Sequence, residues 1–185
     1  SWMPLNARNS LDDNIYILDS NDCDWMFYHS SFDKDMDAVR QGAPGIKGFV
    51  CVDRANGVDP WLQYWLKGFS APAPYIPAKP DDVAAIWPSG GTTGRSKGVM
   101  LTHLNVTTMI ANCCAYMHED DPPVHLIAAP MTHAAGSIAF PLLAMGATQV
   151  IVPRADPLAI MQAIQTHRVT TLFLPPTVIY AMLAH

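Results

Sequence analysis

The residues best suited to chemistry lie together in the stretch 89–98, which reads S-G-G-T-T-G-R-S-K-G. These ten residues include four glycines, four hydroxyl side chains and two cations. Glycine lets the backbone adopt positive φ and brings its N–H groups close to a ligand, hydroxyls donate hydrogen bonds, and lysine adds a positive point charge. This combination is typical of a loop that binds phosphate groups.

Apolar runs flank this loop: residues 83–87 precede it and residues 98–101 follow it. Short apolar runs bounded by turn residues predict strands of a buried sheet. We therefore expect the loop to connect two buried strands, which would hold it rigidly. The alternative is a Gly/Thr-rich turn without function, and the order of the residues favours the phosphate loop.

The spacing differs from that of the P-loop of kinases and GTPases, in which glycine directly precedes lysine and Ser or Thr directly follows it. Here Ser96 precedes Lys97 and Gly98 follows it, while the adjacent hydroxyls of Thr92 and Thr93 come earlier. The sequence therefore argues against a kinase-type phosphate site.

Residues 88–99 instead resemble the signature of the AMP-forming adenylating enzymes, which commonly reads Y-S-G-G-T-T-G-x-P-K-G-V in acyl-CoA synthetases. The family also includes luciferases and nonribosomal adenylation domains. Pro88 stands where an aromatic residue is usual, and Ser96 stands where proline is usual, which removes a restraint of φ to about −65°. We expect a looser loop, with disorder or an unusual path at Pro88 and Ser96.

Three further segments resemble this family in the expected order, so that the resemblance covers nearly the whole chain. Residues 4–6 resemble a segment after the family's first helices, and residues 129–136 resemble its P-x-x-H-x-x-G motif. Residues 173–178 resemble its later V-P-T segment, which contributes to the wall around the acyl group.

The resemblance implies that the parent enzyme joins a carboxylic acid, fatty or aryl, to AMP with release of pyrophosphate. The acyl group then passes to the thiol of coenzyme A, so that ATP, Mg²⁺ and coenzyme A are the expected cofactors and co-substrates. The resemblance assigns phosphate binding to Ser89, Gly90, Gly91, Thr92, Thr93 and Gly94.

Three side chains receive more specific roles from the same resemblance. Lys97 would neutralise the departing pyrophosphate, and Thr93 would contact the magnesium ion or its water shell. His133 would lie beside the carboxylate or acyl group of the substrate, because an imidazole can hydrogen-bond an anion. The alternative for His133 is a histidine packed at the end of a strand.

Other functions stay open at this point. The chain could load a carrier-protein thiol instead of coenzyme A, or it could be a non-catalytic nucleotide-binding module. The segments that the family uses for adenine, ribose and the C-terminal lid are not found in this sequence, and residues 180–185 show no helix cap. We therefore expect a fragment of the large N-terminal domain, catalytically inactive by itself.

Composition narrows the class of protein. Of the 185 residues, 50% are hydrophobic and 15% are charged, which predicts a globular fold with a real core. A net charge of −5 argues against nucleic acid as a partner. The four cysteines show no paired C-x-x-C spacing, and neither a signal peptide nor an 18-residue apolar run is present, which favours a cytoplasmic protein.

The hydrophobic pattern alternates between strands and helices, which predicts an α/β fold with predominantly parallel sheets flanked by helices. Strands are expected near 25–28, 49–52, 124–129, 147–152 and 170–174, and helices near 11–18, 33–40, 59–69, 102–117 and 156–167. Ser10 and Thr102 are expected to cap the first and fourth of these helices, and Asp59 and Pro60 are expected to begin the third, which has a buried apolar side that includes Leu66. The cluster 119–123 predicts a boundary between a first subdomain, 1–122, and the start of a second, 123–185.

Overall fold

The computed structural model describes residues 1–89, 95–117 and 121–185. The chain forms two compact units, each assembled from segments that are separate in sequence. The smaller unit comprises Leu5–Ala78 and Pro88–Val99, and the larger unit comprises Ser1–Pro4, Lys79–Trp87 and Met100–His185. The predicted division into 1–122 and 123–185 stays a prediction, because its boundary adjoins residues outside the described ranges.

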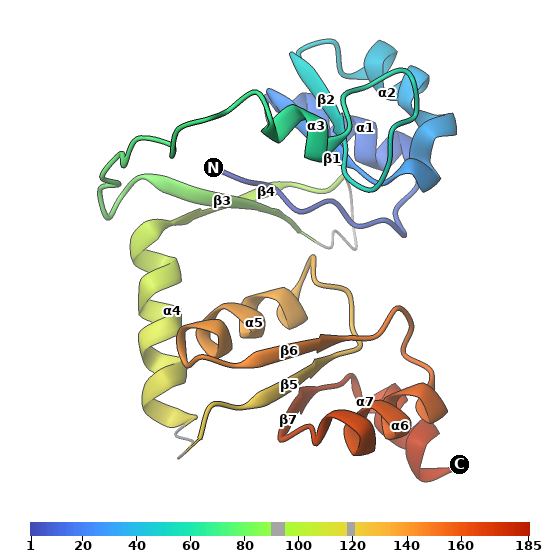
Figure 1. Ribbon diagram of the computed structural model, residues 1–185, viewed down its shortest axis with the longest axis vertical. Helices are drawn as coiled ribbons and strands as arrows, with labels where there is room; N and C mark the ends of the chain where they lie inside the picture. Colours follow the sequence, from blue (N-terminus) through green and yellow to red (C-terminus); the bar gives the residue numbers. More distant parts are fainter. Residues whose placement is uncertain (90–94, 118–120) are drawn as a thin grey trace. The chain divides into compact units, whose positions relative to one another are not determined.

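The smaller unit is built around two parallel strands with helices between them (Figure 1). Its elements in chain order are α1 Leu11–Ser20, β1 Trp25–Tyr28, η1 Ser30–Asp35, α2 Met36–Gly42, β2 Gly48–Cys51 and α3 Leu62–Leu66. The predicted cap of α1 is confirmed, because the Ser10 side chain accepts a hydrogen bond from the Asp13 N–H. The first strand agrees residue for residue with the prediction.

The two faces of this small sheet are covered from opposite sides. On one face, the Arg40 guanidinium of α2 lies 4.3 Å from the centre of the Phe49 ring. On the other face, Trp65 of α3 contacts Trp25 and Phe27 of β1 at 5.7 and 5.8 Å between ring centres. A side chain at Gly48 would overlap the Trp25 ring, which explains glycine at the start of β2.

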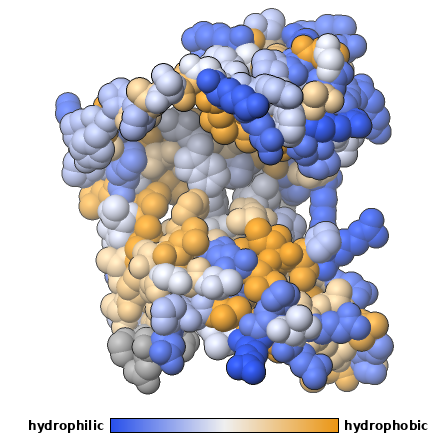
Figure 2. Space-filling view, in the orientation of Figure 1, coloured by the Kyte–Doolittle hydropathy of each residue, from blue (hydrophilic) through white to orange (hydrophobic). Residues whose placement is uncertain are grey.

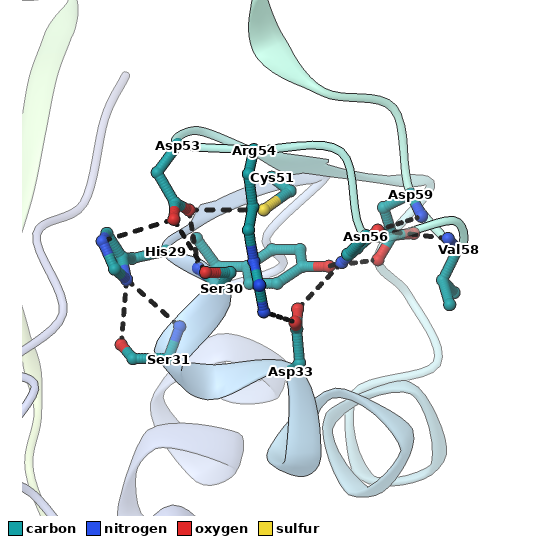
Figure 3. A network of polar contacts seen from close by, with 11 residues as sticks. His29, Ser30, Ser31, Asp33, Cys51, Asp53, Arg54, Asn56, Val58 and Asp59 are labelled. Atoms are coloured by element: carbon teal, nitrogen blue, oxygen red, sulfur yellow. Dashed lines mark hydrogen bonds and ion pairs between the residues drawn. The ribbon is translucent and has the colours of Figure 1, made fainter.

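A polar network joins the carboxyl ends of β1 and β2 (Figure 3). The Asp53 carboxylate accepts hydrogen bonds from the Ser30 backbone N–H and hydroxyl, both at 2.7 Å. These bonds lower the pKa of Asp53 to about 2, so that the carboxylate stays ionised at neutral pH. The network therefore ties the turn after β1 to the turn after β2.

Asp59 corrects the expectation that Asp59 and Pro60 begin a helix with a buried side. The Asp59 carboxylate accepts hydrogen bonds from Arg40 and from the Tyr28 hydroxyl, the latter at 2.6 Å. Burial and this bond raise the pKa of Tyr28 to about 12. Because Asp59 bonds to α2 and β1, α3 begins only at Leu62, and its Leu66 is 52% exposed.

The larger unit contains a three-stranded parallel sheet in the order β6-β5-β7. Its elements are β3 Val83–Pro88, β4 Gly98–Thr102, α4 His103–Tyr116, β5 Val124–Ile127, α5 Ala134–Ala144, β6 Thr148–Ile151, α6 Pro157–His167, β7 Thr171–Phe173 and α7 Pro176–Leu183. The ends of β3 and β4 that lie next to the glycine-rich loop belong to the smaller unit. None of the helices in the described ranges is long and apolar enough to cross a membrane.

Helices cover both faces of the three-stranded sheet, as the sequence predicts (Figure 1). Leu126 and Ala128 point to one side and pack with Ile160 of α6 and with residues of α7. Ile127 points to the other side and packs with Ala135 and Ala139 of α5. Alternate side chains of β5 thus anchor helices on opposite faces.

Strands β3 and β4 pair with each other, which confirms that two strands flank the loop. The expected burial is wrong for β4, in which Val99 and Met100 are 47% and 68% exposed. The pair forms a sheet of only two strands, so that little covers β4 within the described ranges. Thr102 caps α4 as predicted, and its hydroxyl and Asn105 form a capping box.

His125 of β5 is a titratable side chain in the core, with 1% of its surface exposed. Its Nδ1 lies 3.0 Å from the Thr171 hydroxyl, and its neighbours on the adjoining strands, Thr171 and Gln149, are uncharged. Burial lowers the pKa of His125, because the charged imidazolium loses its hydration. The folded chain therefore holds this imidazole neutral.

We expect the buried imidazole to make the fold less stable in mild acid. The folded-state pKa lies below the unfolded value of about 6.5, so stability is lost as pH falls from 6.5 through the folded pKa, by at most about 1.4 kcal/mol per pH unit. Denaturant unfolding of wild type and His125→Asn between pH 7.5 and 5 measures this loss. Equal pH slopes for the two proteins would contradict the expectation.

Candidate functional site

Two of the predicted segments begin at the same edge of the three-stranded sheet. Ile127 and Phe173, the last residues of β5 and β7, are directly paired in register. Because the strands are parallel, the loop after β5, which leads to His133, and the loop after β7, which leads to Thr177, leave side by side. The first leads to α5 on one face of the sheet, and the second leads to α7 on the other.

This divergence defines a topological switch point, the place where open α/β sheets bind their ligands. The side chains at this edge are largely small and apolar. Ala129 and Phe173 pack against the buried cluster of Ile127, Ala135 and Ala139. Apolar side chains therefore pack together at this edge of the sheet.

His133 directly precedes α5, with an exposed side chain and no side-chain cap bond. Its carbonyl accepts hydrogen bonds from the N–H groups of Gly136 and Ser137 at 3.0 and 3.2 Å. The backbone of His133 thus starts the helix, and its imidazole stays available. A side chain at Gly136 would overlap the Met131 carbonyl oxygen, which explains the glycine of the P-x-x-H-x-x-G motif.

The two ends of the glycine-rich loop are joined in the smaller unit. The Ser89 N–H donates to the Lys97 carbonyl at 2.8 Å, and the Lys97 N–H donates to the Ser89 hydroxyl oxygen at 3.0 Å. The Ser96 hydroxyl donates to the Ser89 carbonyl at 2.6 Å. We call these three hydrogen bonds the loop neck.

The loop neck brings Ser89 and Lys97 together, as the predicted phosphate site requires. Gly90, Gly91, Thr92, Thr93 and Gly94 lie outside the described residues, so their predicted contacts to phosphate and Mg²⁺ stay predictions. His133 belongs to the larger unit, and Ser89 and Lys97 belong to the smaller one.

Two cations follow the central glycines, and they differ in their surroundings. The Arg95 guanidinium lies 4.6 Å from the centre of the Tyr16 ring of α1, a cation–π contact. Lys97 is exposed and makes no ion pair with the residues of the described ranges. The Arg95 guanidinium therefore rests on α1, whereas the Lys97 side chain is exposed to solvent.

The contacts of Ser96 and Tyr16 could not be predicted from the sequence. Ser96 appears there only as a departure from the family signature, and its bond to Ser89 depends on how the loop closes. Tyr16 lies far from the loop in sequence, and no motif points to it. Pro88, where disorder or an unusual path is expected, ends β3, and Ser96 forms part of the loop neck. The looser loop expected between them stays a prediction, because residues 90–94 lie outside the described ranges.

The chain matches the family model of the AMP-binding enzymes over residues 2–185. It therefore belongs to the AMP-binding enzyme family, which confirms the resemblance seen in the sequence. The match includes both the loop neck and the edge of the sheet at β5 and β7.

Curated relatives carry the names of acid–CoA ligases. A feruloyl-CoA synthase from Amycolatopsis is 39% identical over 117 residues, covering 60% of this chain and 23% of the relative. A medium/long-chain fatty acid–CoA ligase from Mycobacterium tuberculosis is 31% identical over 116 residues, covering 62% of this chain and 20% of the relative. The matched region is thus about a fifth to a quarter of these proteins.

Solved structures support the fold. The O-succinylbenzoate coenzyme A synthetase of Bacillus subtilis, in a complex with ATP and magnesium ion, superposes with a TM-score of 0.78 at 22% identity. The superposition covers 99% of this chain and 36% of that protein. The α/β fold with parallel sheets and flanking helices that the sequence predicts is therefore confirmed, and this synthetase shares it.

The close approach at Gly136 yields a stability prediction. We expect Gly136→Ala to lower the free energy of unfolding by about 1–3 kcal/mol, because the new methyl group overlaps backbone that cannot move without opening α5. Gly45→Ala is the matched control, since a Cβ at Gly45 meets nothing within 4 Å. Urea unfolding midpoints measure both changes, and equal midpoints for the two variants would show that the contact is not restrictive.

Proposed function

We propose that the protein containing this chain is an ATP-dependent acid–CoA ligase. It activates a carboxylic acid as acyl-AMP with release of pyrophosphate and then forms a coenzyme A thioester. The observation that carries this proposal is the family match over residues 2–185. The matched region includes the glycine-rich loop, whose two ends are joined by hydrogen bonds between Ser89 and Lys97.

The loop supplies the donors that two reacting anions require. The carboxylate must attack the α-phosphorus of ATP, so positive charge and N–H donors have to offset the repulsion. We assign phosphate binding to Ser89, to the backbone of Gly90–Gly94 and to the hydroxyls of Thr92 and Thr93. The ATP and magnesium complex of the Bacillus subtilis synthetase supports the same nucleotide and ion here.

A magnesium ion, when bound, would neutralise phosphate charge, and Thr93 is the residue we assign to it or its water shell. Lys97 then acts on the leaving group. Its exposed ammonium, at about 4 Å from a phosphate oxygen, would contribute about 4 kcal/mol at an effective dielectric of 20 before desolvation. Because pyrophosphate gains charge as it departs, this contribution grows toward the transition state.

His133 is our candidate for the substrate carboxylate or acyl group. Its exposed imidazole lies at the start of α5, where the helix dipole favours a negative charge. The apolar residues Ala129, Ala135 and Phe173 lie at the same edge.

The acid is therefore proposed to have an apolar fatty or aryl body. Feruloyl and medium- or long-chain fatty groups, named for the relatives, are both of this kind. Figure 2 adds that hydrophobic side chains reach the surface over the part of the larger unit where α5 and β6 lie. Coenzyme A rather than a carrier-protein thiol is the proposed acceptor, and that this chain alone is inactive stays a prediction.

Product analysis of the full-length protein tests the reaction class. With ATP, a fatty or aryl acid and coenzyme A, we expect AMP, pyrophosphate and an acyl-CoA in equal amounts. Formation of ADP would indicate a kinase, and no turnover would indicate a binding module. AMP and pyrophosphate without transfer to coenzyme A would favour a carrier protein as the acceptor.

Lys97→Ala tests the role of the loop cation. We expect it to lower kcat/KM for ATP about 100-fold in pyrophosphate exchange, the size of effect seen when one transition-state donor is removed. Lys34→Ala is the control, because Lys34 is also exposed and lies in η1. An unchanged exchange rate in Lys97→Ala, with the melting temperature also unchanged, would overturn the assignment.

A further inference from the structure

We propose that Ser96 is a positioning residue for adenylation, acting through Ser89 to hold Lys97 in place. The Ser96 hydroxyl donates to the Ser89 carbonyl, and the Ser89 hydroxyl oxygen accepts from the Lys97 N–H. The side chains of two serines thus add to the strand-like bond between Ser89 and Lys97. This inference rests on the proposed function, because it concerns the use of Lys97 toward phosphate.

The loop neck restricts the point from which the Lys97 side chain extends. A single hydrogen bond between two chain ends leaves them free to pivot, whereas bonds from Ser96 and Lys97 to the same residue remove that freedom. Ser96 is only partly exposed, so that water competes less for its hydroxyl than at an open surface. Restraining a reacting group before the ligand binds lowers the entropy cost of the bound state.

The residue type at position 96 determines how the loop is restrained there. Proline at this position would limit φ by its ring, and serine has no such limit. Here the restraint comes from the hydroxyl, which bonds across the loop. A side chain that only filled space would not need an oxygen at this position.

Arg95 supports the same arrangement from the preceding residue. Its guanidinium lies on the Tyr16 ring of α1, 4.6 Å from the ring centre, within the same compact unit. This contact anchors the residue before Ser96 to a helix of the unit. The chain entering the loop neck is therefore held at Arg95 by α1 and at Ser96 by Ser89.

Pyrophosphate exchange by the full-length protein tests the positioning role. We expect Ser96→Ala to lower kcat/KM for ATP about 2- to 10-fold, the factor that one hydrogen bond supplies. Ser96→Thr keeps the hydroxyl and should retain wild-type activity. Ser70→Ala is the control, because Ser70 is an exposed serine of the same unit.

Amide hydrogen exchange provides a readout independent of catalysis. In Ser96→Ala, the N–H groups of Ser89 and Lys97 should exchange about 2- to 10-fold faster than in wild type, and in Ser96→Thr they should not. Wild-type activity in Ser96→Ala, or loss of activity in both Ser96 variants alike, would overturn the inference and leave the proposed function intact.

Absence of exchange activity in the wild-type protein would instead refute the proposed function, and the positioning role with it. Amide protection would then still show whether the Ser96 hydroxyl closes the loop.

Discussion

Parallel strands cannot be joined by tight turns, and this constraint shapes both compact units. Each connection must cross a face of the sheet, usually as a helix, before the next strand can start at the same end. In the larger unit, α5 therefore lies on one face and α6 on the other, with β5 in the middle of the sheet. The loops after β5 and β7 meet at one edge as a direct consequence, and they carry His133 and Thr177 to that edge.

The smaller unit meets the same constraint with fewer strands and more polar contacts. Within the described residues, its sheet consists of β1 and β2, so apolar burial is limited and Phe27 is 50% exposed. Hydrogen bonds from Ser30 to Asp53 and from Tyr28 to Asp59 join elements that a larger core would hold by packing. Within this network, the Asp59 carboxylate accepts hydrogen bonds from both Arg40 and Tyr28, which offsets the cost of its burial.

The glycine-rich loop combines both means of restraint. Strands β3 and β4 bring its ends together, and the loop neck then fixes Ser89 against Ser96 and Lys97. Glycine-rich chains have a high entropy to lose on ordering, so the contacts at their ends decide how much of that loss ligand binding has to offset. Under the proposed function, Lys97 would gain its effect on the phosphates from this restraint as well as from its charge.

The sequence by itself determined the elements and the family, because both depend on local patterns. Alternation of apolar runs and cap residues such as Ser10 and Thr102 sufficed to place most strands and helices. The order of residues in the loop sufficed to separate an adenylating enzyme from a kinase. Neither required knowledge of distant contacts.

Only the tertiary structure decided which side chains contact each other across the fold. Aspartate often caps a helix, yet Asp59 bonds to Arg40 and Tyr28, and α3 starts later than its sequence predicts. Arg95 stacks on Tyr16, and Ser96 replaces the restraint of a proline by a bond across the loop. These outcomes depend on closing the chain in three dimensions, where a partner outside the adjacent residues competes with the local pattern and prevails.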